Sequence, residues 1–422
     1  MSAPDDIVTV QPPLISRNMY VFLFAMILAN MGGNMYQPLL PLYLKDLGAG
    51  VTQIGLFFTL SQVIPLALQI LGGWISDTVG RLRAIAFGSL AGVLAYMTLI
   101  LSPSWEWLLL GSAFSSIGGA LVAPSFDAYI AENSQASSRA RVFGITQALF
   151  MIVGVIGPIL GGLLADSRGF KFMLMVAAVL YFIATIIRFG MARTAAKDIE
   201  SQPRKLSLSG LKVNMGAMMG MVLAGGVVSW IMITDGVRDI SFGLSLNFLP
   251  VYMDQIGGMN LKQIGFLNSV FGLFIMLTTI PAGWLADKKG ERVVIASGFI
   301  FLSLAMLVIV FMPTQSIWLY ALGWAFGGMG IGMATPGYSS LISKVVPKGL
   351  RGTAFGLFST SLGMVSLPAP WLGGILWTRF SPQTPFLITG IVSMLCAIPA
   401  WFKFRLPGNS QNEVEGQFPA NQ

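Results

Sequence analysis

The sequence contains no histidine and only one cysteine, Cys396. Without histidine the chain cannot use imidazole acid–base catalysis, histidine-ligated metals or a Ser-His catalytic pair. A single cysteine cannot form an internal disulfide or a cysteine-rich metal site. The Gly-Lys-Ser/Thr loop that would indicate an ATP-driven pump is also absent. We therefore expect neither an enzyme nor a protein that holds a metal or a cofactor.

Charge is equally scarce, because only 10% of the 422 residues are charged while 55% are hydrophobic. Ordinary soluble domains carry about 25% charged residues. Apolar windows of about 20 residues, long enough to cross a bilayer as helices, follow one another along the chain. The composition therefore predicts an all-α polytopic membrane protein. The expected spans are 18–44, 53–76, 83–102, 105–131, 142–165, 171–190, 228–253, 263–285, 293–312, 316–342, 353–377 and 384–402.

The distribution of the basic residues predicts the orientation of these twelve spans. With both termini on one side, 19 Lys and Arg residues lie on that side, five on the other, and Arg238 inside a span. Cytoplasmic loops carry the excess of Lys and Arg. We therefore expect cytoplasmic termini in the cell membrane, and a net charge of +8 that reflects topology rather than nucleic-acid binding.

The spans divide into two groups of six around a polar segment. The expected organisation is a cytoplasmic tail over 1–17, a bundle over 18–190, a linker with an amphipathic lead-in over 191–227, a second bundle over 228–402 and a cytoplasmic tail over 403–422. The apolar stretch 213–234 could be read as an extra span. We place the seventh helix at 228–253 instead, because a thirteenth span would move three basic residues to the outer side.

An internal repeat relates the two halves of the chain. Gln53-Ile54-Gly55 recurs as Gln263-Ile264-Gly265, an offset of 210 residues, and Phe143-Gly144 recurs as Phe355-Gly356, an offset of 212. Near-constant offsets of this kind indicate a duplicated six-helix unit. Further pairs are Gly73-Trp74 with Gly283-Trp284, Asp77 with Asp287, Gly80 with Gly290, Arg139 with Arg351, and Pro158 with Pro370.

These motifs resemble those of the major facilitator superfamily. The segment Gly73-Trp-Ile-Ser-Asp77-Thr-Val-Gly80-Arg81 is similar to that family's loop between helices 2 and 3, and a weaker copy ends at Gly290. Asp127-Ala-Tyr-Ile-Ala-Glu132 and the pattern Gly154-x-x-Gly157-Pro158 look most like the drug/proton antiporter branch. The resemblance implies the twelve-helix fold of two six-helix bundles and transport by alternating access.

The repeated charges at the inner ends of the helices suggest a gating role, and the alternative is that they only set the topology. Asp77 and Asp287 can each face the start of a helix in the opposite bundle, where a carboxylate is favoured by the helix dipole. Contacts of this kind exist only when the inner faces are closed. The resemblance further suggests that Asp127 is a partner of Arg81 in that closed gate. The expected gating residues are Gly73, Asp77, Gly80, Arg81, Asp127, Asp287, Gly290 and Arg351.

Ionisable groups inside spans are costly and indicate function by default. Four are expected here, namely Asp127, Asp235, Arg238 and Asp239. Arg238 can pair with Asp235 and adjoins Asp239, so the three can form a self-neutralised structural cluster. The alternative is that Asp239, as the excess negative charge, takes a proton or meets a cation. Asp127 and Asp239 are the two candidates for proton coupling.

A polar stripe on the first span provides the expected substrate contacts. Asn30, Asn34 and Gln37 recur at helical spacing and would face a central cavity lined by helices 1, 4, 7 and 10. The same residues could instead make ordinary interhelical hydrogen bonds. The complete set of expected substrate-binding residues is Asn30, Asn34, Gln37, Gln147, Arg238, Asp239, Asn247 and Asn268.

Three functions fit the sequence. The first is a secondary transporter that exports small lipophilic or weakly cationic compounds, with protons as the coupling ion. A phosphorylated substrate is disfavoured because Arg238 is the lone basic residue expected in the core. The second is an importer or facilitator of a neutral polar metabolite such as a sugar. The third is a transport-dead membrane sensor or a membrane enzyme. We expect a monomer in the lipid bilayer that meets a small-molecule substrate.

Overall fold

The computed structural model describes residues 15–68, 80–135, 138–194, 220, 223, 225–311, 316–346 and 364–405. These residues form helices and contain no strand. The N-terminal half consists of α1 Arg17–Tyr36, η1 Gln37–Leu39, α2 Leu40–Asp46, α3 Val51–Ser61, α5 Arg81–Leu101, α6 Trp107–Glu132, α7 Arg139–Arg168 and α8 Phe170–Thr194. The C-terminal half consists of α10 Val227–Ser245, η3 Leu246–Phe248, α11 Leu249–Gln255, α12 Leu261–Lys289, α13 Glu291–Phe311, α14 Ile317–Val345, α16 Ala369–Arg379 and α17 Thr384–Lys403.

Helices long and apolar enough to cross a bilayer dominate both halves, and ten of them occur within the described residues. The seventh expected span, 228–253, is covered by α10, η3 and α11, and the eleventh ends in α16. The outer surfaces expose large apolar side chains such as Phe87, Phe182 and Ile391. An apolar exterior of this kind is stable in lipid rather than in water. The prediction of an all-α, twelve-helix membrane fold is confirmed.

The duplication seen in the sequence is repeated in the backbone. The first span breaks at η1 and continues as α2, and the seventh breaks at η3 and continues as α11, 209 residues later. Gly80 and Gly290 both lie in the left-handed region, with φ of 93° and 89°. Only glycine adopts this conformation without strain. Each therefore permits the tight turn into the following helix, α5 or α13.

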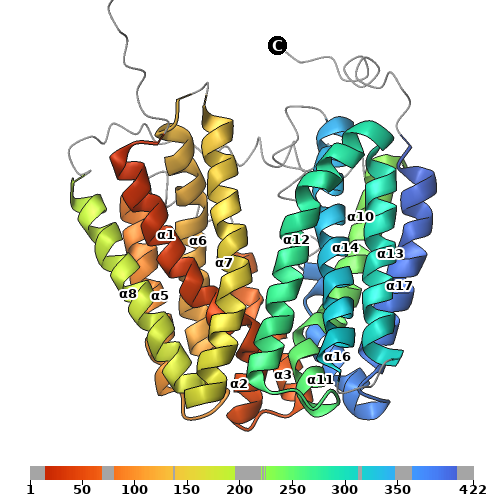
Figure 1. Ribbon diagram of the computed structural model, residues 1–422, viewed down its shortest axis with the longest axis horizontal. Coiled ribbons are helices and arrows are strands. Elements are labelled where there is room, and N and C mark those ends of the chain that lie inside the picture. The colour runs from red at the N-terminus through yellow and green to blue at the C-terminus, as the bar shows by residue number, and fades with distance from the viewer. Residues whose placement is uncertain are drawn as a thin grey trace, which may run out of the picture.

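The two bundles stand side by side and converge at one end (Figure 1). The converging end is formed by α2, α3 and α11, whereas the bundles diverge at the end that carries the termini of the described chain (Figure 1). Two seams join them, α3 against α16 and α7 against α12. Glycines make this approach possible: a Cβ on Gly265 would stand 2.5 Å from the carbonyl oxygen of Pro158. We call these contacts the α3–α16 seam and the α7–α12 seam.

Candidate functional site

A cavity of about 420 Å³ lies within the N-terminal bundle. Its walls come from α1, α5, α6, α7 and α8. We call it the N-bundle cavity. Its polar lining residues are Asn30, Asn34, Tyr36, Gln37, Tyr96, Ser115, Asp127, Tyr181 and Arg188. The structure thus brings together Asn30, Asn34, Gln37 and Asp127 of the residues expected from the sequence.

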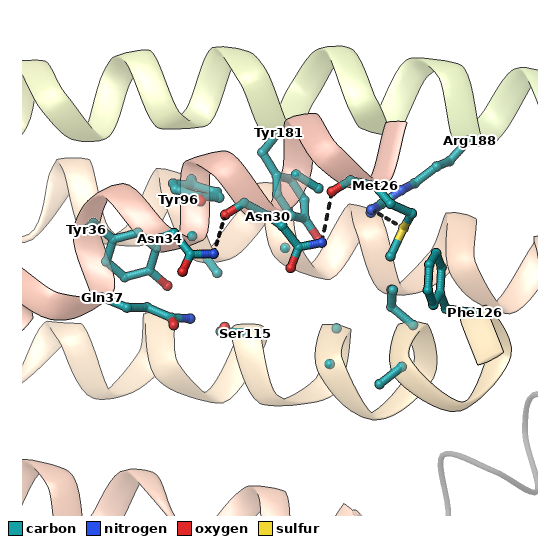
Figure 2. A pocket seen from close by; sticks show the side chains of 18 of the residues that line it. Met26, Asn30, Asn34, Tyr36, Gln37, Tyr96, Ser115, Phe126, Tyr181 and Arg188 are labelled. Atoms are coloured by element: carbon teal, nitrogen blue, oxygen red, sulfur yellow. Dashed lines mark hydrogen bonds between the residues drawn. The ribbon is translucent and has the colours of Figure 1, made fainter. Parts of the chain in front are cut away.

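The amide stripe of α1 forms one wall of this cavity. The Nδ2 of Asn30 donates to the carbonyl oxygen of Met26 at 2.8 Å, and the Nδ2 of Asn34 donates to that of Asn30 at 2.9 Å. Both amide nitrogens are therefore held by their own helix. Figure 2 shows both amide oxygens turned toward the helix that carries Ser115 and Phe126. The wall consequently presents hydrogen-bond acceptors to the cavity.

Three tyrosines from three helices form a second wall. The rings of Tyr36 and Tyr96 are 5.6 Å apart, and those of Tyr96 and Tyr181 are 5.2 Å apart. Gly92 gives Tyr181 its space, because any Cβ there would overlap the phenol group. Aromatic rings with hydroxyl groups offer apolar contact and hydrogen bonds together. This wall suits a ligand that has an apolar body.

Arg188 lines the cavity and corrects the expectation of four intramembrane charges. The distribution of basic residues predicts that Arg188 is one of the 19 on the inner side, but its side chain is 2% exposed within α8. Its Nη1 donates to the Oγ of Ser89 at 2.7 Å, and its Nη2 contacts the Sδ of Met26 at 2.8 Å. The expected sixth span, 171–190, contains this residue, so the hydropathy pattern was compatible with an arginine inside the helix and only the count of basic residues assigned it to the inner side.

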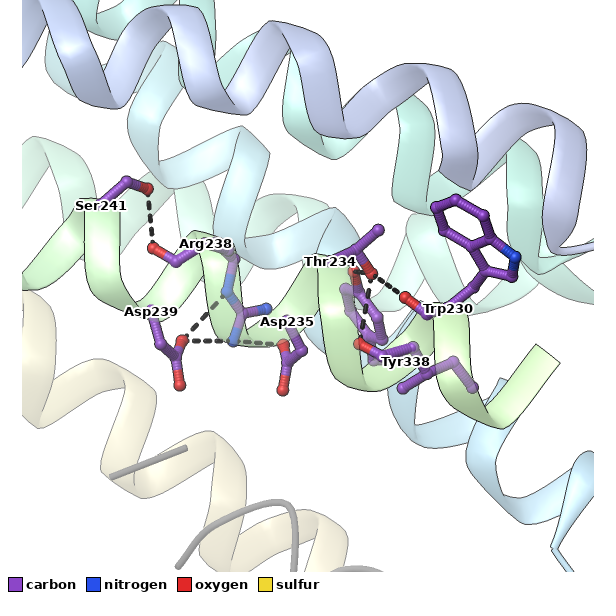
Figure 3. Close-up of polar contacts among 8 residues, drawn as sticks. Trp230, Thr234, Asp235, Arg238, Asp239, Ser241 and Tyr338 are labelled. Atoms are coloured by element: carbon purple, nitrogen blue, oxygen red, sulfur yellow. Dashed lines mark hydrogen bonds and ion pairs between the residues drawn. The ribbon is translucent and has the colours of Figure 1, made fainter. Parts of the chain in front are cut away.

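The charged cluster of α10 forms as the sequence suggested. The Nη2 of Arg238 lies 2.6 Å from Asp235 and 2.8 Å from Asp239 (Figure 3). Its guanidinium also lies over the ring of Tyr338, whose hydroxyl is 2.9 Å from the Oγ1 of Thr234. The cluster carries two carboxylates for one guanidinium. Asp239 is its most accessible member, at 34% exposure against 15% for Asp235.

The remaining expected substrate residues lie elsewhere. Asn247 and Asn268 line a smaller cavity of about 210 Å³ between the bundles, where Gln37 also contributes. Most of that cavity's lining is apolar, including Phe271 and Trp324. Gln147 is exposed on α7. The expected set is therefore distributed over two cavities, the charged cluster of α10 and one exposed helix face rather than gathered in one site.

The described gating residues lie at the divergent end. Arg81 forms an ion pair with Glu132 at 3.0 Å, and Asp127 lies about one turn further inside. Asp287 is exposed at the end of α12. The expected contacts of Asp127 and Asp287 belong to a closed inner gate, so they stay predictions. Gly73, Asp77 and Arg351 lie outside the described residues.

The C-terminal bundle repeats the Arg81–Glu132 pair with its charges exchanged. Glu291 follows Gly290 as Arg81 follows Gly80, and it pairs with Lys344, which corresponds to Glu132. Glu291 is 4% exposed and also accepts a hydrogen bond from Ser340 at 2.8 Å. Each pair joins the first turn of one helix to the last turns of the next. Both pairs therefore fasten helices within a bundle at the divergent end.

Comparison with known proteins identifies the fold and the family. A family model described as Major Facilitator Superfamily matches residues 22–233 and 231–420. The chain is 25% identical to multidrug resistance protein MdtG of Dickeya zeae, over 95% of this chain and 98% of that protein. It is 25% identical to a Na(+), Li(+), K(+)/H(+) antiporter of Planococcus maritimus, over 93% and 96%. A crystal structure of a peptide transporter POT in complex with sulfate superposes with a TM-score of 0.73 at 14% identity, over 91% of this chain and 93% of that one.

Proposed function

Because the chain belongs to the Major Facilitator Superfamily and is a multi-pass membrane transporter, we propose that it exports small lipophilic compounds from the cell in exchange for protons. The observation that carries the proposal is a cavity with polar and aromatic walls in a molecule closed at one end and divergent at the other. This arrangement is one state of an alternating-access cycle. With cytoplasmic termini, as the charge bias predicts, the divergent end faces the cytoplasm.

The relatives support the direction and the coupling. One is named for multidrug resistance and another for cation/proton antiport. A weakly cationic substrate stays a prediction. The argument against a phosphorylated substrate depended on Arg238 being the lone basic residue of the core, and Arg188 is a second.

We assign proton coupling to Asp239. Protonation of Asp239 leaves Arg238 paired with Asp235, so no arginine is left without a partner. Protonation of a carboxylate that was the sole partner of a buried arginine would be far more costly. Asp127, exposed at the mouth of the N-bundle cavity, is the runner-up.

Export is tested in cells with and without the protein, with a panel of fluorescent lipophilic compounds and a proton uncoupler. We expect lower accumulation in cells that contain the protein, and we expect the uncoupler to remove the difference. Export that survives the uncoupler contradicts proton coupling. Compound that enters only when the protein is present favours the second candidate, uptake of a neutral polar metabolite, for which the amide stripe of α1 is suited.

The coupling residue is tested in proteoliposomes with an imposed pH gradient. We expect Asp239→Asn to abolish gradient-driven transport while exchange of labelled for unlabelled substrate continues, because binding does not require the proton site. Asp166→Asn, on the exposed end of α7, is the matched control and should behave as wild type. If Asp127→Asn gives the exchange-only behaviour and Asp239→Asn does not, the assignment is wrong.

A further inference from the structure

Arg188 is buried in the N-bundle cavity, and the described part of the chain gives it no acidic partner. Among the described residues, no carboxylate lies within ion-pair distance of its guanidinium, in contrast to Arg238, which has two. Its Nε is buried and has no hydrogen-bond acceptor. The ring of Tyr181, 5.7 Å from its Cζ, supplies some stabilisation. A buried cation this poorly compensated is expected to meet an anion in some state of the working protein.

The unsatisfied part of the guanidinium has the geometry of a carboxylate site. Nη1 donates a hydrogen bond to the Oγ of Ser89, which leaves the opposite edge of the guanidinium, formed by Nε and Nη2, for another acceptor. Of the Nε and Nη2 nitrogens, which together form a parallel fork, Nη2 contacts the thioether of Met26 and Nε has no acceptor among the described residues. A thioether is a weak acceptor on a flexible side chain. A carboxylate can replace it and accept two parallel hydrogen bonds, as Asp239 does from the Nε and Nη2 of Arg238 at 3.2 and 2.8 Å.

The surroundings indicate what the rest of the ligand is. Beyond Arg188 the cavity continues between the tyrosine wall and the amide stripe (Figure 2). These walls offer ring faces and a few acceptors, and Arg188 is the single basic residue among the cavity's lining residues. One guanidinium suits one planar monovalent anion, whereas a phosphate would require several basic groups.

We propose that the N-bundle cavity binds an amphipathic organic carboxylate, whose carboxylate displaces Met26 from the Nε–Nη2 fork of Arg188 and whose apolar body lies against the tyrosine wall. This inference deepens the proposed function, since it names the charge class of the exported compound. Binding and export are separate measurements, so either claim can fail without the other.

The test measures binding to the purified full-length protein by thermal stabilisation. The probes are aryl and alkyl monocarboxylates, each paired with its primary amide. We expect the carboxylates to bind the wild type more tightly than the amides, and Arg188→Gln to weaken carboxylate binding about 10-fold or more while amide binding changes little. Arg193→Gln, exposed on the same helix, is the matched control and should keep the preference.

A second variant guards against loss of folding. Arg188→Lys keeps the charge but cannot present a planar fork, so we expect carboxylate affinity between those of the wild type and Arg188→Gln. If Arg188→Gln is not monodisperse, the carboxylate affinity of Arg188→Lys tests whether binding depends on the planar fork. Equal affinity of the wild type for carboxylates and amides, or a carboxylate preference that survives substitution of Arg188, overturns the inference. Arg188-dependent binding without export in cells would leave the inference standing and remove the export function.

Discussion

At the scale of single residues, the two intramembrane arginines differ in how their buried positive charge is compensated. Arg238 has two carboxylates and an aromatic ring, whereas Arg188 has a hydroxyl, a thioether and a ring. Placing an arginine at the centre of a membrane helix costs about 2.5–3.5 kcal/mol on insertion scales. The cluster on α10 offsets that cost internally, which favours a structural role for its arginine. Arg188 is left with capacity for a ligand.

The structural role of Arg238 predicts a graded effect on stability. Arg238→Gln leaves Asp235 and Asp239 side by side without a cation, and we expect a loss of about 3 kcal/mol, the lower limit for breaking a buried pair, because 20% of the side chain is exposed. Asp239→Asn should cost much less, since the Asp235 pair remains. Thermal unfolding in detergent measures both. The double variant Arg238→Gln/Asp235→Asn should recover part of the loss, and no recovery would contradict the charge-based explanation.

At the scale of helices, the α7–α12 seam depends on glycine. Gly162 and Gly265 face each other, and a Cβ on Gly265 would lie 2.9 Å from the Cα of Gly162 as well as 2.5 Å from the oxygen of Pro158. Both neighbours are backbone atoms, which cannot move aside as a flexible side chain can. The same arrangement recurs in the α3–α16 seam, where Gly55 faces Pro370. The seams therefore hold the convergent end closed in this state.

We expect Gly265→Ala to open the convergent end. Overpacking of this kind costs about 1–3 kcal/mol, and here the cost applies only to the closed seam. Spin labels at Asp46→Cys and Gln255→Cys, in a Cys396→Ala background, report the separation of α2 and α11. In Gly265→Ala we expect an additional population with a longer distance between the two spin labels. Gly283→Ala on the same helix, with nothing within 4 Å, should leave the distances of the parent protein unchanged; a shift in both variants, or in neither, contradicts the seam's role.

At the scale of the whole molecule, the two bundles meet at an axis of approximate two-fold symmetry. Lys45 on α2 and Asp254 on α11 are 209 residues apart, the offset that relates these two helices, and they form an ion pair with each other. Residues that correspond by duplication can touch only close to the axis that relates them. The pair therefore bridges the bundles at the centre of the convergent end.

Because the Lys45–Asp254 pair lies at the symmetry axis, we expect the two residues to tolerate an exchange of their charges. Both side chains are at least a third exposed, so we expect the pair to contribute less than about 1 kcal/mol. Lys45→Asp places two carboxylates on the axis and should raise the open population about five-fold at most. The exchanged variant, Lys45→Asp with Asp254→Lys, should return the label distances to those of the wild type. If the exchanged variant stays as open as the single variant, the bridge does not act through charge.

The sequence by itself determined the class, the fold and the duplication of this protein. Hydropathy, basic-residue bias and a constant offset are properties of the linear chain, because a bilayer imposes its thickness and its polarity on each helix separately. The same reasoning identified the α10 cluster, since Asp235 and Arg238 are neighbours on one helix turn. Contacts of this local kind need no knowledge of other helices.

Only the tertiary structure decided which end is closed, which polar residues share a cavity and what surrounds Arg188. These features depend on side chains from helices far apart in sequence: Ser89 on α5 and Met26 on α1 both contact Arg188 on α8. The count of basic residues assigns an arginine near a span's end to the inner side, whereas the helix continues to Thr194 and the packed neighbours bury the side chain. Burial is a property of the packed bundle rather than of the segment, and for that reason the fold was predictable from the sequence and Arg188's position in the cavity was not.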